Sequence, residues 1–207
     1  TPGTLSDESL LDANSDSLLL ALHSDGDHYG LAWVDMSSGR FLITEVKGEQ
    51  SLAGELERLR PAEVLVAEGS VHPGLQRHQS IREQPPWCFD LDGARRALNI
   101  QFQTQDLRGF GCEDLTVALS AAGCLLDYLK DTQRSDLPHL QGIRQEKLSD
   151  SGLLDAATRR NLEIDQNLHG GVEHTLFSVL DSAQTATGTR HLRRWLHRPI
   201  NDVVELD

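Results

Sequence analysis

Cysteine, methionine and aromatic residues are scarce in this sequence: its 207 residues include three Cys, one Met and 5% aromatic residues. Cys88, Cys112 and Cys124 are odd in number and form no Cys-x-x-Cys pair, which argues against a disulfide framework and against a zinc knuckle. We therefore interpret them as small, buried hydrophobic residues. Free thiols of this kind fit the reducing environment of a cytoplasm.

Long hydrophobic runs are also missing. The longest, such as residues 18–22, are far shorter than the roughly 20 apolar residues that cross a bilayer. The opening Thr-Pro-Gly-Thr is followed by acidic and polar residues, without the basic and apolar regions of a secretory signal. We therefore expect no membrane association, and the missing initial Met suggests a piece excised from a longer protein.

Basic residues, which binding to nucleic acid generally requires, are fewer than acidic ones. The net charge is −13. Residues 1–149 hold 13 Lys and Arg against 23 Asp and Glu, a balance of −10, and residues 150–207 hold 6 against 9, a balance of −3. Such a surface repels a phosphate backbone, so we do not expect strong DNA binding by this chain alone. The acidic first part is typical of a protein-facing module.

Motifs for catalysis and for cofactors are absent. There is no Gly-x-Ser-x-Gly and no Walker A loop, so we expect neither nucleophilic catalysis nor ATP hydrolysis here. The nine His are scattered at no common metal-ligand spacing. The loop of residues 107–111 lacks the lysine and third glycine of a phosphate cradle, which favours a turn capped by Phe110. We predict no catalytic, cofactor-binding or metal-ligating residues.

What is present is an α/β pattern. Three short apolar runs, at residues 17–23, 29–36 and 40–46, are separated by turn residues and predict an antiparallel meander. Leu residues at helical spacing predict a helix over 50–60, which ends at Pro61. The β-branched run at 62–68 follows at a crossover length that suits parallel pairing. Together these elements predict a mixed sheet with flanking helices.

Further elements follow along the chain. Residues 71–89 predict one helical turn and one edge strand, because prolines break any longer element. A helix is expected over 90–99, and another over 114–131 with Asp114 as its cap; the second is apolar over most of its circumference and should lie between two layers. Residues 143–149 predict a strand or extended connection.

Two shorter helices are expected near the C-terminal end, at residues 175–181 and 189–198. In the second, Leu192, Trp195 and Leu196 group on one side of the helix. The opposite side is basic and is interpreted either as a solvated or ion-paired face or as a contact for phosphates or another domain; it consists of Arg190, Arg193, Arg194 and Arg198.

The predicted meander, helix and fourth strand have the topology of the ribonuclease H-like fold. Nucleases with that fold hold two metal ions with several converging carboxylates. Here only Asp35 and Glu68 fall in the second and fourth strand regions, too few for that constellation. A metal-dependent nuclease or resolvase is therefore the enzymatic alternative to a binding function, and an independent acidic interaction domain is a third possibility.

Several segments resemble the MutS family of DNA mismatch-recognition proteins, in the same order as in that family. The most specific is Asp155-Ala156-Ala157-Thr158-Arg159-Arg160-Asn161-Leu162-Glu163-Ile164. Others are Thr1-Pro2-Gly3-Thr4, Ala121–Leu126 with Lys130–Arg134, and Gly188–Pro199, with weaker likeness at Asp35–Phe41 and Pro61-Ala62-Glu63. The likeness spans essentially the whole chain.

The resemblance implies a domain organisation. Residues 1–12 would be a linker from a missing mismatch-binding domain, and residues 13–150 a connector domain with a ribonuclease H-like fold and no nuclease activity. Residues 151–207 would start the helical core, or lever, domain. Such a segment would transmit conformational signals between the DNA-binding and ATPase parts of a bacterial cytoplasmic DNA-repair protein.

The resemblance also implies partners and site residues. ATP, Mg²⁺ and mismatched DNA would bind the homo-oligomeric parent protein outside this chain, and the partners here would be MutL and other MutS domains. We expect MutL docking on the helix and loop that carry Arg95, Arg96, Asn99 and Gln101, whose two arginines should both be exposed, with a merely solvated helix as the alternative. Arg159 and Arg160 are expected to form ion pairs at a domain junction.

Overall fold

The computed structural model describes residues 18–72, 75, 80–133, 137–147 and 156–199. They belong to two compact units, divided between Glu146 and Lys147, and each unit is considered separately below. The linker expected at residues 1–12 and Asp155 of the MutS-like segment lie outside the described residues. The predicted domain limits, 13–150 and 151–207, stay predictions because residues 148–155 are not described either.

The first unit is built on the predicted antiparallel meander. Strand β1 (Leu18–Asp25) pairs with β2 (His28–Asp35), and β2 pairs with β3 (Arg40–Lys47). The first five residues of β1 and the last seven of β2 are buried, whichever way their side chains point. Burial on both faces explains why apolar and polar residues do not alternate cleanly in these strands.

Helix α1 (Glu49–Leu59) supplies the predicted crossover to a parallel strand. It ends at Arg60, which adopts a left-handed conformation directly before Pro61. Strand β4 (Glu63–Ala67) then pairs parallel with β1. Two shorter strands lie at the margins of the sheet: β5 (Ile81–Gln84) beside β4 and β6 (Arg144–Gln145) beside β3, both parallel to their neighbours.

The strand order β5-β4-β1-β2-β3-β6 confirms the α/β fold class and the mixed sheet. A three-stranded meander whose first strand also pairs with a parallel fourth strand is the ribonuclease H-like arrangement that the sequence predicted. The short elements of residues 71–89 are confirmed as well, since β5 is an edge strand and Pro86–Phe89 (η4) form one 3-10 turn.

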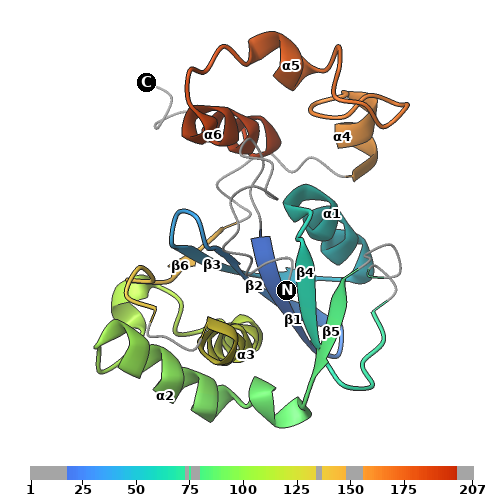
Figure 1. Ribbon diagram of the computed structural model, residues 1–207. Coiled ribbons are helices and arrows are strands. Elements are labelled where there is room, and N and C mark those ends of the chain that lie inside the picture. The colour runs from blue at the N-terminus through green and yellow to red at the C-terminus, as the bar shows by residue number, and fades with distance from the viewer. Residues whose placement is uncertain (1–17, 73–74, 76–79, 134–136, 148–155, 200–207) are drawn as a thin grey trace. The chain divides into compact units, whose positions relative to one another are not determined.

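Helices cover both faces of this sheet (Figure 1). Helix α1 lies on one face, and α3 (Thr116–Gln133) with α2 (Leu91–Phe102) lies on the other. The Asp90 side chain caps α2 by accepting a hydrogen bond of 2.7 Å from the Gly93 N–H. The 3-10 turn η5 (Arg108–Phe110) lies between α2 and α3 in the chain, where the sequence predicted a turn.

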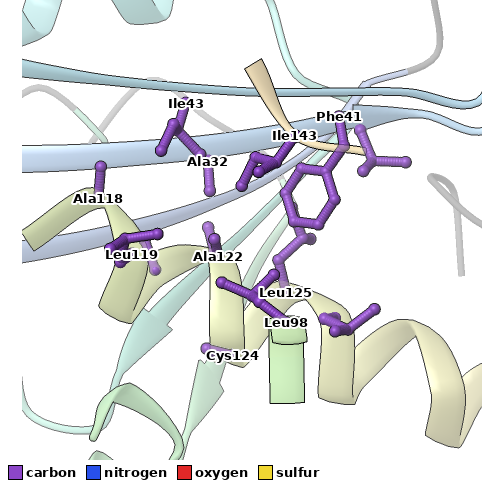
Figure 2. Packing of buried hydrophobic residues seen from close by; sticks show 14 of the residues in the cluster. Ala32, Phe41, Ile43, Leu98, Ala118, Leu119, Ala122, Cys124, Leu125 and Ile143 are labelled. Atoms are coloured by element: carbon purple, nitrogen blue, oxygen red, sulfur yellow. The ribbon is translucent and has the colours of Figure 1, made fainter. Parts of the chain in front are cut away.

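Helix α3 lies between the sheet and α2, as its nearly all-apolar circumference predicted. Two glycines permit the close approach: a Cβ at Gly30 of β2 would lie 2.2 Å from the Val117 carbonyl carbon, and one at Gly123 would lie 2.3 Å from the Ala94 Cβ. Each buried leucine in this layer contributes about 1.5–3 kcal/mol. Figure 2 shows side chains of the sheet meeting those of α3, among them Ala32, Phe41, Ile43, Leu119, Ala122 and Leu125.

The start of α3 differs from the prediction. The helix begins at Thr116, and the Glu45 carboxylate of β3 accepts hydrogen bonds from the N–H groups of Val117 and Ala118, at 2.8 and 3.0 Å. The expected cap, Asp114, lies exposed before the helix. A carboxylate at this position satisfies donors that lack partners within the helix and complements its dipole.

The second unit is helical, as predicted, and consists of α4 (Ala156–Asn161), α5 (Leu176–Leu180) and α6 (Ala186–His197). The hydroxyls of Thr175 and Thr185 cap α5 and α6 by accepting hydrogen bonds from backbone N–H groups, both at 3.1 Å. Between α4 and α5 the chain turns around Asn167, whose Oδ1 accepts hydrogen bonds from the N–H groups of His169 and Gly171.

The apolar side predicted for α6 is only partly buried, since Leu192 and Leu196 are half-buried. Thr189 and His197 are buried, whereas Trp195 is 62% exposed. Arg193, one of the arginines predicted for the opposite side, is half-buried, and its guanidinium lies 4.6 Å from the centre of the Phe177 ring. Among the described residues, none of the helices combines the length and apolar character that crossing a lipid bilayer requires.

Candidate functional site

The surface predicted for partner docking is only partly exposed. Arg96 on α2 is exposed, as expected. Arg95 is half-buried instead, because its Nη2 reaches back and donates to the Glu113 carbonyl oxygen at 3.3 Å. The expectation that both arginines are exposed is therefore wrong for Arg95, which helps to hold the segment before α3.

Two other predicted docking residues form hydrogen bonds to neighbouring loops. The Asn99 amide donates to the Gln105 carbonyl oxygen at 3.1 Å. The Gln101 amide donates to the Leu137 carbonyl oxygen at 2.9 Å, across 36 residues of sequence. Both side chains therefore shape the loops around α2, and of the four predicted residues Arg96 is the one left on the open surface.

Sequence reasoning missed two large apolar residues near Arg96 in the chain. Ile100, one helical turn after Arg96, is 74% exposed, and Trp87 in η4 is 76% exposed. The spacing of four residues between Arg96 and Ile100 was a usable signal, because it places both on one face of a helix. The exposed face of α2 thus presents a cation beside an aliphatic side chain.

The two acids weighed for a nuclease site lie in different environments. Asp35, at the end of β2, is buried and accepts hydrogen bonds from Ser37, Ser38 and Arg40, the last at 3.1 Å. Burial disfavours its charged form, but these hydrogen bonds outweigh that effect and lower the pKa of its carboxyl. Asp35 is therefore committed to closing the turn between β2 and β3.

Glu68 lies exposed just after β4, where its backbone N–H donates to the Gln84 carbonyl oxygen at 2.9 Å. Within the described part of the chain, no group of three or more His, Cys, Asp or Glu side chains is placed to hold a metal ion. The residues that are described thus give no support to a two-metal site.

The prediction that the cysteines are buried is confirmed for two of the three. Cys112 and Cys124 are buried and free, whereas Cys88 is half-buried against the core. Burial raises the pKa of the Cys112 thiol to about 11, and it raises that of Cys124 as well. Both thiols therefore stay protonated at neutral pH, which makes them hydrophobic packing residues and poor nucleophiles.

The first unit contains two groups of buried, ion-paired side chains that the sequence did not indicate. Glu63, fully buried at the start of β4, accepts a hydrogen bond of 2.8 Å from the Tyr128 hydroxyl of α3 and forms an ion pair with Arg82 of β5. In the second group, Arg58 of α1 forms ion pairs with Glu55 and Glu146. Both groups connect elements far apart in the sequence, which single-residue patterns do not reveal.

In the second unit, Arg159 of α4 is half-buried and Arg160 is exposed. Both residues make interactions, and their assignment to a domain junction stays a prediction. The second unit also contains a pair that the sequence did not indicate: His197 Nε2 is 3.1 Å from Asp165 Oδ2, with both side chains buried. It joins α6 to the segment after α4.

The predicted basic face of α6 is largely engaged within its own unit. Besides Arg193 on Phe177, Arg194 Nη2 lies 3.2 Å from His191 Nδ1, and Arg198 donates to the Lys147 carbonyl oxygen at 2.6 Å. Arg190 also makes interactions. These contacts favour the structural interpretation of the arginines over a phosphate-binding face.

A ribonuclease H-like α/β domain followed in the chain by a helical unit is the domain organisation that the resemblance to the MutS family implied. Comparison with protein-family models agrees: residues 17–141 match MutS domain II and residues 157–207 match MutS domain III. The chain therefore belongs to the MutS family of DNA mismatch-repair proteins.

Proposed function

We propose that this chain is a non-catalytic connector and core segment that transmits conformational signals between the DNA-binding and ATPase parts of a MutS protein and docks MutL. The observation that carries the proposal is the match to MutS domains II and III along one chain. ATP, Mg²⁺ and mismatched DNA belong, in this proposal, to the homo-oligomeric bacterial parent protein outside this segment.

Tight packing supports a role in transmission. Close approaches at Gly30 and Gly123 leave no room for even one methyl group between the sheet, α3 and α2. Such a core moves as a body, because densely packed interiors yield little to strain. A displacement applied at one margin of the first unit would therefore reach the opposite margin.

The exposed face of α2 supports a role in docking. Arg96 can pair with a carboxylate of a partner, and the adjacent Ile100 offers apolar area that binding would bury. Arginine is enriched among the residues that contribute most of the binding energy of protein interfaces. Arg95, Asn99 and Gln101 support this face by holding the loops beneath it.

Titration of the chain with purified MutL tests the docking proposal. Arg96→Glu should abolish saturable binding, because it reverses the charge that an acidic partner surface would meet. Arg108→Glu, at an exposed arginine in η5, carries the same charge change and should leave binding unchanged. Absence of binding by the parent chain, or equal losses in both variants, rejects the proposed surface.

A ribonuclease H-like nuclease or resolvase is the alternative, favoured by the strand order of the first unit. Incubation with Mg²⁺ and branched or RNA–DNA hybrid substrates tests it. Mg²⁺-dependent cleavage of these substrates would establish the alternative and displace the non-catalytic proposal.

A further inference from the structure

Arg58 on α1 lies between two carboxylates at the end of the first unit. Its Nη2 is 2.6 Å from Glu55 Oε2 and 2.7 Å from Glu146 Oε2. Its side chain is 9% exposed, and the guanidinium carbon lies 5.8 Å from the centre of the Trp33 ring. Arg58, Glu55 and Glu146 are called the exit clamp below, because Glu146 is the last residue of the unit.

At least three separate interactions hold Glu146. Its N–H donates to the Ile43 carbonyl oxygen at 2.8 Å, and its own carbonyl oxygen accepts a hydrogen bond of 2.9 Å from the Thr44 hydroxyl. The ion pair with Arg58 is the third. Backbone and side chain of this residue are thus fixed to β3 and to α1 at the same time.

The two ion pairs of Arg58 differ in what they connect. Glu55 lies three residues before Arg58 in the same helix, so this pair joins no separate elements. Glu146 is 88 residues away in sequence, and its pair joins α1 to the segment where the chain leaves the sheet. If the clamp served only to neutralise a buried arginine, the local pair with Glu55 would be sufficient.

Strand β6, which directly precedes Glu146, is very short. It has two residues, Arg144 and Gln145, which pair with Leu42 and Ile43 of β3. A two-residue strand at the margin of a sheet has few ladder hydrogen bonds, and such segments open locally at low free energy. A buried, charge-assisted pair just after it supplies the missing restraint.

We propose that Arg58 is a positioning residue whose pair with Glu146 fixes the end of the first unit, so that movement of the chain beyond Lys147 is passed to β3 and α1 together. The second half of this statement rests on the proposed transmission function. The first half, that the long-range arm of the clamp holds the exit segment, stands on the geometry of the first unit alone.

Hydrogen exchange on the whole chain compares two matched variants. Glu146→Gln and Glu55→Gln each remove one negative charge from the same arginine and leave it the other carboxylate. We expect Glu146→Gln to speed exchange of the amides at positions 144 and 146, which face β3, about tenfold, with β1 and β2 unchanged. Glu55→Gln should leave these amides protected. Equal effects of the two variants, or no effect of Glu146→Gln, overturns the proposal.

Glu146→Asp guards against a general loss of stability. It retains the charge but shortens the side chain by one methylene, so the carboxylate no longer reaches Arg58 with the same geometry. Local opening in this variant, with the unfolding midpoint of the unit unchanged, supports the clamp; protection equal to the parent chain contradicts it. MutL binding through Arg96 is measured separately, so failure of the clamp and failure of the docking proposal are distinguished.

Discussion

The carboxylate of Glu45, on β3, accepts a hydrogen bond of 2.8 Å from the backbone N–H of Val117, at the start of α3. The same oxygen accepts a second bond from Ala118 at 3.0 Å. A strand residue thus caps the central helix of the domain from 72 positions away in the sequence. The cap fixes the helix end against the sheet at the place where Gly30 lets them touch.

Replacing this cap should destabilise the first unit measurably. Glu45→Ala leaves two N–H groups of α3 without their acceptor and should lower the free energy of unfolding by about 1–2 kcal/mol. Asp114→Ala, at the exposed residue that the sequence alone suggested as the cap, should change it by less than about 0.5 kcal/mol. Urea denaturation of the three proteins measures both values. The reverse ranking would show that Asp114 is the functional cap.

The close contact between Gly123 and Ala94 predicts a second effect. Gly123→Ala places a methyl group 2.3 Å from the Ala94 Cβ and should destabilise the unit by about 1–3 kcal/mol through overpacking. Ala94→Gly in the same protein makes room and should recover part of the loss. The double-mutant cycle in urea gives the coupling between the two sites.

A matched helical glycine serves as the control. Gly54 lies within α1, and a Cβ there would meet nothing within 4 Å. Gly54→Ala should therefore raise stability by up to about 1 kcal/mol, since alanine favours the helix. If Gly123→Ala and Gly54→Ala behaved alike, the packing of α3 against α2 would be looser than described.

These contacts mark the limit of what the sequence could predict. The meander, α1, β4 and α3 follow from apolar periodicity and turn residues, which are local signals. Glu45 as a helix cap, Arg58 with Glu146, and His197 with Asp165 arise from tertiary proximity, which one sequence does not encode in any local pattern. For the same reason Arg95 was expected to be exposed, although it reaches the Glu113 carbonyl oxygen.

The docking residues show a related limit. The 3.6-residue period placed Arg96 correctly on the outer face of α2. It could not indicate that the Asn99 and Gln101 amides would find carbonyl acceptors at Gln105 and Leu137, because those acceptors belong to irregular segments. Exposed Ile100 was missed because an isolated isoleucine is usually read as a core residue.

Histidines near the end of β1 predict a dependence of stability on pH. Burial lowers the pKa of His72, and the neighbouring His23 lowers it further; burial also lowers the pKa of His23. A lowered folded pKa means that the stability contribution is full above the unfolded value of 6.5 and is lost as pH falls through the folded value. Stability should therefore decline as pH falls below the unfolded value of 6.5.

His72→Phe tests this dependence, because it retains an aromatic ring beside Tyr29, whose ring centre lies 6.1 Å from that of His72. The variant should lose less stability than the parent chain on going from neutral to mildly acidic pH in urea titrations. His28→Gln, at an exposed histidine of β2, should keep the parental slope. An unchanged slope in His72→Phe would exclude His72 as the source.

Asp35 predicts a separate effect at lower pH. Because its folded pKa is lowered, its contribution is present above the unfolded value of 3.8 and is lost as pH falls below it. Asp35→Asn should lower the free energy of unfolding by about 1–3 kcal/mol at neutral pH, since hydrogen bonds to a buried charge are lost. Denaturation at successive pH values should show the variant and parent converging in acid. If the difference in unfolding free energy between variant and parent did not change with pH, the loss of stability would come from the altered shape of the side chain and not from its charge.

The strongest expected effect is at Leu126, which is fully buried in α3. Leu126→Asp buries a carboxylate without a partner at a cost of several kcal/mol, comparable with the roughly 5–15 kcal/mol that stabilise a whole domain. Cooperative unfolding of the first unit should disappear in calorimetry. Ile100→Asp introduces the same charge on the exposed face of α2 and should leave the transition intact. A cooperative transition in Leu126→Asp would mean that α3 is not held between two layers.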